Sequence, residues 1–120
     1  MRIIAVDYDG TITLRNSYPN VGEFKPGAIE VLKGLKKKGY KLILWTCRSG
    51  AELEVIVEAM KKRGLVFDAV NDQLPDIKSM YDIDSRKVFA DMYIDDLAYG
   101  SPARDPMFWI NFGRQYGMEV

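Results

Sequence analysis

Short apolar runs recur along the chain, and each gives way to polar residues. Four of these runs have the length expected of strands that are buried on both faces of a sheet. They span residues 2–6, 41–46, 67–71 and 88–94. The first run ends in the acidic stretch DYD, and the last ends in the acidic pair DD. The pattern therefore predicts buried strands that present reactive side chains where they end.

Amphipathic stretches separate the first three predicted strands. Pro26 suits the first turn of a helix with one apolar stripe, and Gly39 follows its end. A second helix is expected from Ser49 to Gly64, because its apolar residues recur three and four positions apart. Ser49 and Glu52 have the spacing of a capping box, which would satisfy backbone amides at the helix start.

The other segments are less regular. Residues 14–25 contain too many Asn, Ser, Pro and Gly residues for a long regular element, so they predict a loop or flap. Residues 75–86 fit either a short helix or a loop, and residues 100–106 are expected to form a loop. Asp105 is expected to cap a last helix that runs through residues 112–116.

Strands that alternate with helices indicate an α/β fold, because parallel neighbours need crossover connections and helices supply them. We therefore predict a three-layer α/β/α Rossmann-like fold with a mostly parallel sheet, in a single domain over residues 1–120. Ligands of such sheets bind outside the carboxyl ends of the strands. The side chains expected at that edge are those of Asp7, Asp9, Thr46, Asp95 and Asp96.

Composition restricts the chemistry at this edge. The chain has no histidine, which removes Ser-His-Asp and Cys-His nucleophiles and imidazole metal sites. Its formal net charge of zero gives no reason to expect nucleic acid or an anionic membrane as a partner. Cys47 is the single cysteine, so no internal disulfide is expected and a reducing cytoplasm fits best. No apolar run reaches the ~20 residues of a membrane span, and the first residues turn acidic too early for a secretory signal.

Two acidic pairs from separate strands repel one another if they meet at one edge. Unit charges ~4 Å apart cost about 1 kcal/mol in water and about 4 kcal/mol at an effective dielectric of 20. A cation is therefore expected among them, and an all-oxygen cluster without His or Cys suits Mg²⁺. The predicted ligands are Asp7, Asp9, Asp95 and Asp96.

Asp7 is the candidate nucleophile. An aspartate with a reference pKa near ~3.9 can attack phosphorus without activation by histidine, and Asp7 is rigidly placed because it ends a strand. Asp9 follows across a turn that Gly10 helps the chain to make. Asp9 is therefore the candidate general acid/base, which would protonate the leaving group and then activate water.

The sequence DYDGT resembles motif one of the haloacid dehalogenase-like (HAD) superfamily, which has the form Asp-x-Asp-x-Thr in its phosphatases. LILWT, which ends in Thr46, is similar to motif two, and YIDD resembles the acidic motif four. The resemblance implies that Thr46 hydrogen-bonds the transferring phosphoryl group. It also implies that Asp7 and one acid of the YIDD pair bind Mg²⁺ by side chain, whereas Asp9 uses its backbone carbonyl.

The third motif of this superfamily is a lysine that steadies the nucleophile and the phosphate. Lys87 resembles it by position, and Lys78 is a competitor. Most members insert a cap domain, but residues 14–25 and 64–86 are too short for a large one, so the chain resembles a capless member. The expected activity is that of a Mg²⁺-dependent phosphatase that forms an aspartyl-phosphate intermediate.

The substrate is less defined than the reaction. Gly10, Thr11, Thr46 and Arg48 are the candidate substrate-binding residues, although Arg48 is equally compatible with an ordinary surface role. A phosphorylated small molecule or saccharide-type substrate is expected, by resemblance to small phosphatases associated with polysaccharide biosynthesis. The aromatic C-terminal segment is compatible with a homodimer. Two alternatives stay open: a receiver-like phosphoacceptor signalling domain, and a HAD-like protein that binds phosphate without turnover.

Overall fold

The computed structural model describes residues 2–82 and 84–120, and it contains one parallel sheet. Its strands are β1 (Ile3–Val6), β2 (Lys41–Leu44), β3 (Ala69–Val70) and β4 (Met92–Ile94). They lie in the order β3-β2-β1-β4, and every neighbouring pair is parallel. The strand order reverses at β1, so the ends of β1 and β4 are the place where such sheets bind ligands.

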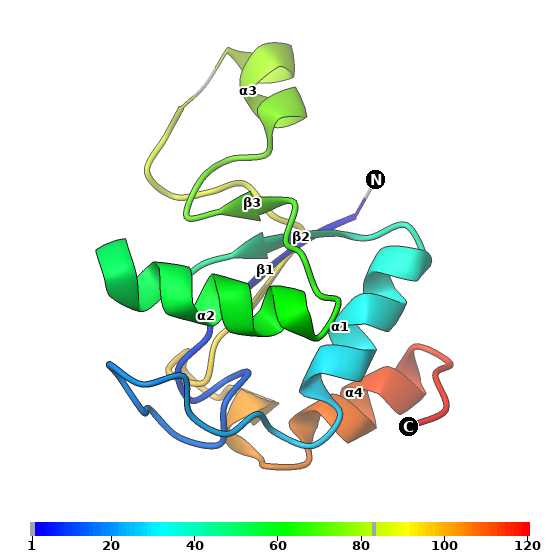
Figure 1. Cartoon of the computed structure of the whole chain (residues 1–120). Helices are drawn as coiled ribbons and strands as arrows, with labels where there is room; N and C mark the ends of the chain where they lie inside the picture. Colours follow the sequence, from blue (N-terminus) through cyan, green and yellow to red (C-terminus); the bar gives the residue numbers. More distant parts are fainter. Residues whose placement is uncertain (1, 83) are drawn as a thin grey trace.

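Helices cover both faces of the sheet, as Figure 1 shows. On one side lie α1 (Ala28–Lys37), α2 (Gly50–Lys62) and α4 (Phe108–Gln115), and on the other side lies the short α3 (Pro75–Tyr81). A single turn of 3₁₀ helix, η1 (Pro102–Arg104), precedes α4. The predicted α/β fold with a parallel sheet is therefore confirmed, and it has three layers.

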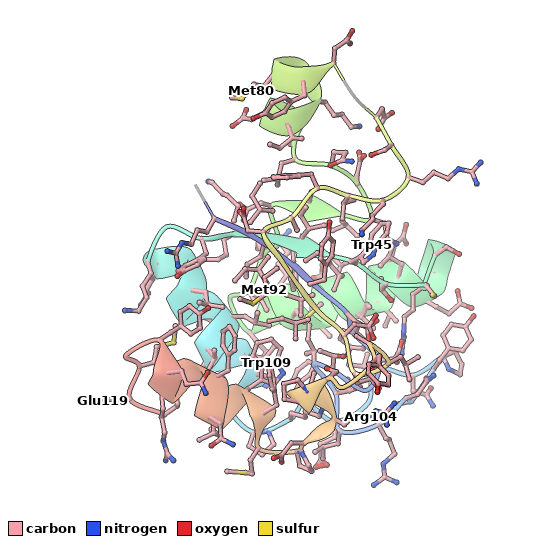
Figure 2. The ribbon with its side chains drawn as sticks, turned by 180° about the vertical axis from the view of Figure 1, so that it is seen from behind. Trp45, Met80, Met92, Arg104, Trp109 and Glu119 are labelled. Carbon is pink, nitrogen blue, oxygen red and sulfur yellow. The ribbon has the colours of Figure 1, made fainter. Side chains whose placement is uncertain are left out.

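The two layers differ in how much core they enclose. Side chains along β1 alternate between the faces, so Ile4 and Val6 join the core beneath α1, α2 and α4, while Ile3 and Ala5 face α3. The first core is the larger and contains the fully buried Trp109. Figure 2 shows Trp109 on that side of the sheet and Met80, on α3, at the opposite end of the molecule.

All four strands are shorter than predicted, and at the starts of β3 and β4 aspartate side chains take over hydrogen bonds. Asp91 accepts the Ile3 amide through Oδ2 at 2.7 Å, and Asp68 accepts the Leu42 amide in the same way at 2.8 Å. Regular pairing therefore begins after these residues, at Met92 in β4 and at Ala69 in β3.

Three other predictions need adjustment. The capping box was wrong, because the Ser49 side chain makes no capping hydrogen bond at the start of α2. Residues 75–86, which were open between helix and loop, form α3 followed by irregular chain. The last helix runs from Phe108 to Gln115 and its cap residue is Met107 rather than Asp105, while Asp105 Oδ1 accepts the Met107 amide at 2.8 Å in the turn just before it. None of the helices in the described part of the chain combines the length and the apolar character that crossing a membrane requires.

Candidate active site

The strand register brings the acids of two segments together. Val6 is paired with Leu44 of β2 and with Ile94 of β4. The Asp7 amide continues this pairing and donates to the Ile94 carbonyl at 2.9 Å. Asp7 and Asp95 therefore leave the sheet side by side. At the other end of the same strand pair, Ile3 contacts Asp91, which lies 88 positions later in the sequence.

Three carboxylates converge at this edge. Asp7, Asp95 and Asp96 each offer an oxygen, and these oxygens lie within 4.8 Å of one another. Within residues 2–82 and 84–120, no Lys or Arg nitrogen lies within 4.0 Å of any of the three carboxylates. The donor set is all oxygen and carries uncompensated negative charge, which is the chemistry that a hard divalent cation such as Mg²⁺ requires. The residues present therefore fit this ion.

Thr11 and Gly10 hold the acids close. The Thr11 hydroxyl lies 3.0 Å from Asp7 Oδ2 and 3.1 Å from Asp96 Oδ1, and it accepts the Asp96 amide at 2.9 Å. Its single proton can be donated to only one of the two carboxylates at a time. Gly10 has a φ of 81°, and a Cβ built on it would lie 2.4 Å from Asp96 Oδ2. Only glycine permits this approach of the turn to Asp96.

The electrostatics of the cluster are visible in Asp7. Burial is the largest cause that raises the pKa of Asp7 to about 8, and the charge of Asp95 and the contact with Asp96 add to it. The hydrogen bond from Thr11 acts in the opposite direction. The protein on its own therefore disfavours the ionised form of Asp7, and a bound cation would favour it.

Asp9 lies in a different environment from its neighbour. Its carboxylate accepts two hydrogen bonds from Arg48, from Nε to Oδ2 at 2.8 Å and from Nη2 to Oδ1 at 2.8 Å. The side chain of Arg48 is 1% exposed and that of Asp9 is 15% exposed, so the pair is largely shielded from water. Any contribution of Asp9 to a cation site would come from its backbone, as the resemblance implied.

Arg48 has no donor left for a substrate anion. Besides the two contacts with Asp9, it donates to the backbone carbonyls of Pro19, Asn20 and Glu52. These contacts use all five N–H groups of the guanidinium, which also lies 5.1 Å from the Tyr8 ring centroid and 5.3 Å from that of Tyr18. In this structure Arg48 connects Asp9, the flap and the start of α2.

Thr46 lies one residue beyond the position opposite Asp7 in the β1–β2 register. Its amide donates to Asn71 Oδ1 at 2.8 Å, and its hydroxyl accepts the Arg48 amide at 3.2 Å. Asn71, with a φ of 52°, also donates from Nδ2 to the Arg48 carbonyl at 3.2 Å. Asn71 therefore fixes the turn after β2, a role that the sequence analysis missed although a polar residue after a short strand was its one signal.

Neither candidate for the steadying lysine contacts Asp7. Lys87 is exposed, and its nitrogen lies 5.1 Å from the Tyr93 ring centroid. Lys78 lies on α3 and pairs with Asp72 at 2.9 Å. The lysine that is buried near the acids is Lys25, which the sequence analysis did not single out.

A parallel, three-layer α/β fold with an acidic, all-oxygen cluster at the carboxyl ends of adjacent strands defines a Rossmann-like domain with a candidate divalent-cation site. No protein-family model and no curated protein matches this chain. Among solved structures, a conserved protein from Bacteroides thetaiotaomicron is 38% identical, with a TM-score of 0.77, over 94% of this chain and 90% of that one. The chain therefore belongs to the same family as this Bacteroides protein.

A more distant similarity is to the D,D-heptose 1.7-bisphosphate phosphatase from B. bronchiseptica, whose crystal structure is complexed with magnesium and phosphate. The two chains are 24% identical, and the match has a TM-score of 0.48 over 69% of this chain and 65% of that one. At this level the likeness assigns neither substrate nor mechanism to the present chain.

Proposed function

We propose that this protein is a Mg²⁺-dependent phosphohydrolase that cleaves phosphate monoesters through an aspartyl phosphate on Asp7. The observation that carries the proposal is the contrast within one turn: Asp7 belongs to a cluster of three carboxylates, whereas Asp9 is held apart from it by Arg48. This contrast supports one role beside a cation for Asp7 and a separate role in proton transfer for Asp9.

In the first step, an Asp7 oxygen would form a bond to phosphorus while the ester P–O bond breaks, and the leaving oxygen takes a proton from Asp9. In the second step, Asp9 would accept a proton from water, whose oxygen attacks phosphorus and releases Asp7 and inorganic phosphate. Mg²⁺, held by Asp7, Asp95, Asp96 and the backbone of Asp9, would offset the charge that the phosphoryl oxygens bring.

The contact with Arg48 restricts how Asp9 works. Both carboxylate oxygens of Asp9 accept hydrogen bonds from the guanidinium. A proton on Asp9 can be carried only by an oxygen that releases its Arg48 N–H group, so the contact has to loosen before the first step. The same contact holds Asp9 in one orientation for its role as base in the second step.

Other residues would bind the phosphoryl group. Thr46 accepts a hydrogen bond through its hydroxyl oxygen and keeps its own proton for a phosphoryl oxygen. Gly10 and Thr11 follow Asp9 in the turn after β1 and contact the carboxylate cluster, so they are the other candidates for binding the phosphoryl group. The geometry does not support Lys87 as the lysine that steadies the nucleophile, because its exposed ammonium lies over the Tyr93 ring.

We further propose that residues 1–120 form one capless hydrolase domain that acts on a phosphorylated small molecule or saccharide-type substrate in the cytoplasm. The shortness of residues 7–27, between β1 and α1, and of residues 63–91, between α2 and β4, supports the capless assignment. A groove of about 1080 Å³ runs along α2 between Val21 and Val70, and it is lined by none of Asp7, Asp9, Asp95 and Asp96.

The decisive experiment is turnover of p-nitrophenyl phosphate with Mg²⁺. We expect many turnovers per protein, loss of activity with EDTA, and a drop of about a thousandfold or more in Asp7→Asn. Asp76→Asn, the same substitution at an exposed position of α3, is the control and should stay within about twofold of wild type. Substantial activity in Asp7→Asn would refute the nucleophile, and a single phosphorylation without turnover would favour the receiver-like alternative.

A further inference from the structure

Lys25 carries a buried positive charge close to the acids. The residue lies at the end of the flap, is 2% exposed, and is the one buried lysine among residues 2–82 and 84–120. Its ammonium donates to the Gly10 carbonyl at 2.8 Å and also to the Ala103 carbonyl. Within the described chain, no carboxylate oxygen lies within 4.0 Å of this nitrogen.

A buried cation without an ion-pair partner is costly, since its charge is removed from water and no opposite charge contacts it. Burial accordingly lowers the pKa of Lys25, while the charges of Asp96, Asp105 and Asp7 oppose this lowering. The acids therefore act on Lys25 without touching it. The hydrogen bonds that the Lys25 ammonium makes among the described residues go to the Gly10 and Ala103 carbonyls. Any structural effect of Lys25 is therefore exerted through these two carbonyls.

The two carbonyls belong to the two segments that enclose Asp96. Gly10 lies in the turn after β1, so close to Asp96 that a Cβ built on it would lie 2.4 Å from Asp96 Oδ2. Ala103 lies in η1, whose next residue, Arg104, donates from Nε to the Asp96 carbonyl at 2.9 Å. Lys25 thus connects the two segments that hold Asp96 from two sides. Its partners are Gly10, 15 positions earlier in the sequence, and Ala103, 78 positions later.

We propose that Lys25 is a positioning residue of the cation site, which sets the separation of Asp7 and Asp96 by fixing the Gly10 and Ala103 carbonyls relative to each other. The inference rests on the proposed function, because it concerns the same acids. It assigns to a lysine of the flap a role that neither Lys87 nor Lys78 fulfils in this structure.

The direction in which Mg²⁺ affinity changes when Lys25 is replaced distinguishes a positioning role from a purely electrostatic one. Lys25→Met keeps the length of the side chain but removes both hydrogen bonds and the charge. If Lys25 contributed only its positive charge, its removal would strengthen Mg²⁺ binding, since like charges repel. If Lys25 positions the acids, its removal weakens binding, because the carboxylates lose the separation that the ion requires.

The experiment is calorimetric titration of Mg²⁺ into the wild-type protein, Lys25→Met and Lys33→Met. Lys33 is the matched control, because its ammonium also donates to a backbone carbonyl, that of Arg63 at 3.1 Å, but on the exposed surface. We expect binding about tenfold weaker or more in Lys25→Met and unchanged binding in Lys33→Met. Equal or tighter binding in Lys25→Met would overturn the inference while leaving the proposed function intact. Absence of Mg²⁺ binding by the wild type would overturn the proposed function itself, and the inference with it.

A measurement on the wild-type protein covers the case in which Lys25→Met does not fold. Burial slows exchange of the Lys25 ammonium protons with water, so their NMR signal is expected to be observable. Mg²⁺ should shift this signal with the midpoint found by calorimetry, because the two carbonyls that it contacts move with the acids. A signal that stays unchanged at saturating Mg²⁺ would contradict the coupling.

Discussion

Asp7 and Asp9 belong to the same turn, two positions apart, yet their surroundings are opposite. Asp7 lies among two other carboxylates, and its pKa is raised to about 8 by burial and by their charge. Asp9 is paired with a guanidinium that is 1% exposed and that makes two hydrogen bonds to it. A strand that ends in Asp-x-Asp sends one side chain toward β4 and the other toward the turn after β2.

The comparison shows how a short sequence separates two chemical roles. Asp7 has no positive side chain within 4.0 Å among the described residues, and the proposed cation would compensate the negative charge of its cluster. Asp9 has its compensating charge built in, so its position is fixed before any ligand binds.

The largest effect on stability is expected at the Arg48–Asp9 pair. Arg48→Met should lower the free energy of unfolding by about 3–5 kcal/mol, because it leaves the Asp9 carboxylate shielded and without its partner. Urea unfolding of Arg48→Met, Asp9→Asn and the double variant measures the coupling between the two residues. The double variant should be more stable than Arg48→Met alone, since no unpaired charge remains.

Arg48→Lys is the matched control for this experiment. It keeps the charge but cannot form the two parallel hydrogen bonds to Asp9 or reach all three carbonyls. An intermediate loss of stability is expected. If Arg48→Met cost less than about 1 kcal/mol, the pair would behave as an exposed ion pair, and the contrast between the two acids would not hold.

The second effect concerns the packing of Asp96 on the turn. Gly10→Ala should lower the free energy of unfolding by about 2 kcal/mol or more, because its φ of 81° is strained for alanine and its Cβ would lie 2.4 Å from Asp96 Oδ2. Gly100→Ala shares the left-handed conformation, with a φ of 71°, but nothing lies within 4 Å of its Cβ. The difference between the two variants in urea unfolding therefore isolates the contact with Asp96.

The same pair of variants tests the cation site. Gly10→Ala should weaken Mg²⁺ binding, since Asp96 has to move, whereas Gly100→Ala should leave it unchanged. Equal losses of stability in the two variants, with equal Mg²⁺ binding, would show that the approach of Gly10 to Asp96 is not essential to the cluster.

The sequence predicted the acids better than it predicted their partners. The apolar runs locate the ends of β1 and β4 because strand burial is a local pattern, and parallel pairing then brings Asp7 and Asp95 together. Arg48 and Asp9 are 39 positions apart, and Lys25 and Ala103 are 78 apart. Such contacts depend on how the flap and η1 pack after folding, and no local pattern in the sequence encodes them.

The capping box illustrates the same limit at shorter range. Ser49 and Glu52 have the required spacing, but the first turn of α2 is held by Arg48, which donates to the Glu52 carbonyl at 3.2 Å. The shortened β3 and β4 were missed for a related reason. Whether Asp68 and Asp91 accept backbone amides of neighbouring strands depends on the sheet register and not on their own neighbours in the sequence.

The smallest effect is expected at Asp7, whose charge has no positive partner. Replacing Asp7 should stabilise the protein, whereas the changes at Arg48 and Gly10 should destabilise it. The pKa of Asp7 in the folded protein is about 8 against an ordinary value of 3.8, so folding favours the neutral carboxyl. Stability from this source is present below pH 3.8 and is lost as the pH rises through 8. Asp7→Asn removes the dependence. In EDTA, the variant should melt about 5 °C above wild type near pH 8, with a smaller difference near pH 5.5. Only part of the pKa difference is recovered as stability, because the amide that replaces the carboxyl is polar and has to be buried too.

Mg²⁺ should reverse this order, because a cation among the three carboxylates favours the ionised Asp7. Near pH 8, saturating Mg²⁺ should raise the melting temperature of the wild type by more than that of Asp7→Asn, which has lost one ligand. Melting curves at the two pH values, with Mg²⁺ and with EDTA, separate the two contributions. If Asp7→Asn were no more stable than wild type near pH 8 in EDTA, the three carboxylates would not repel one another as the geometry implies, and the contrast between Asp7 and Asp9 would reduce to the Arg48 pair alone.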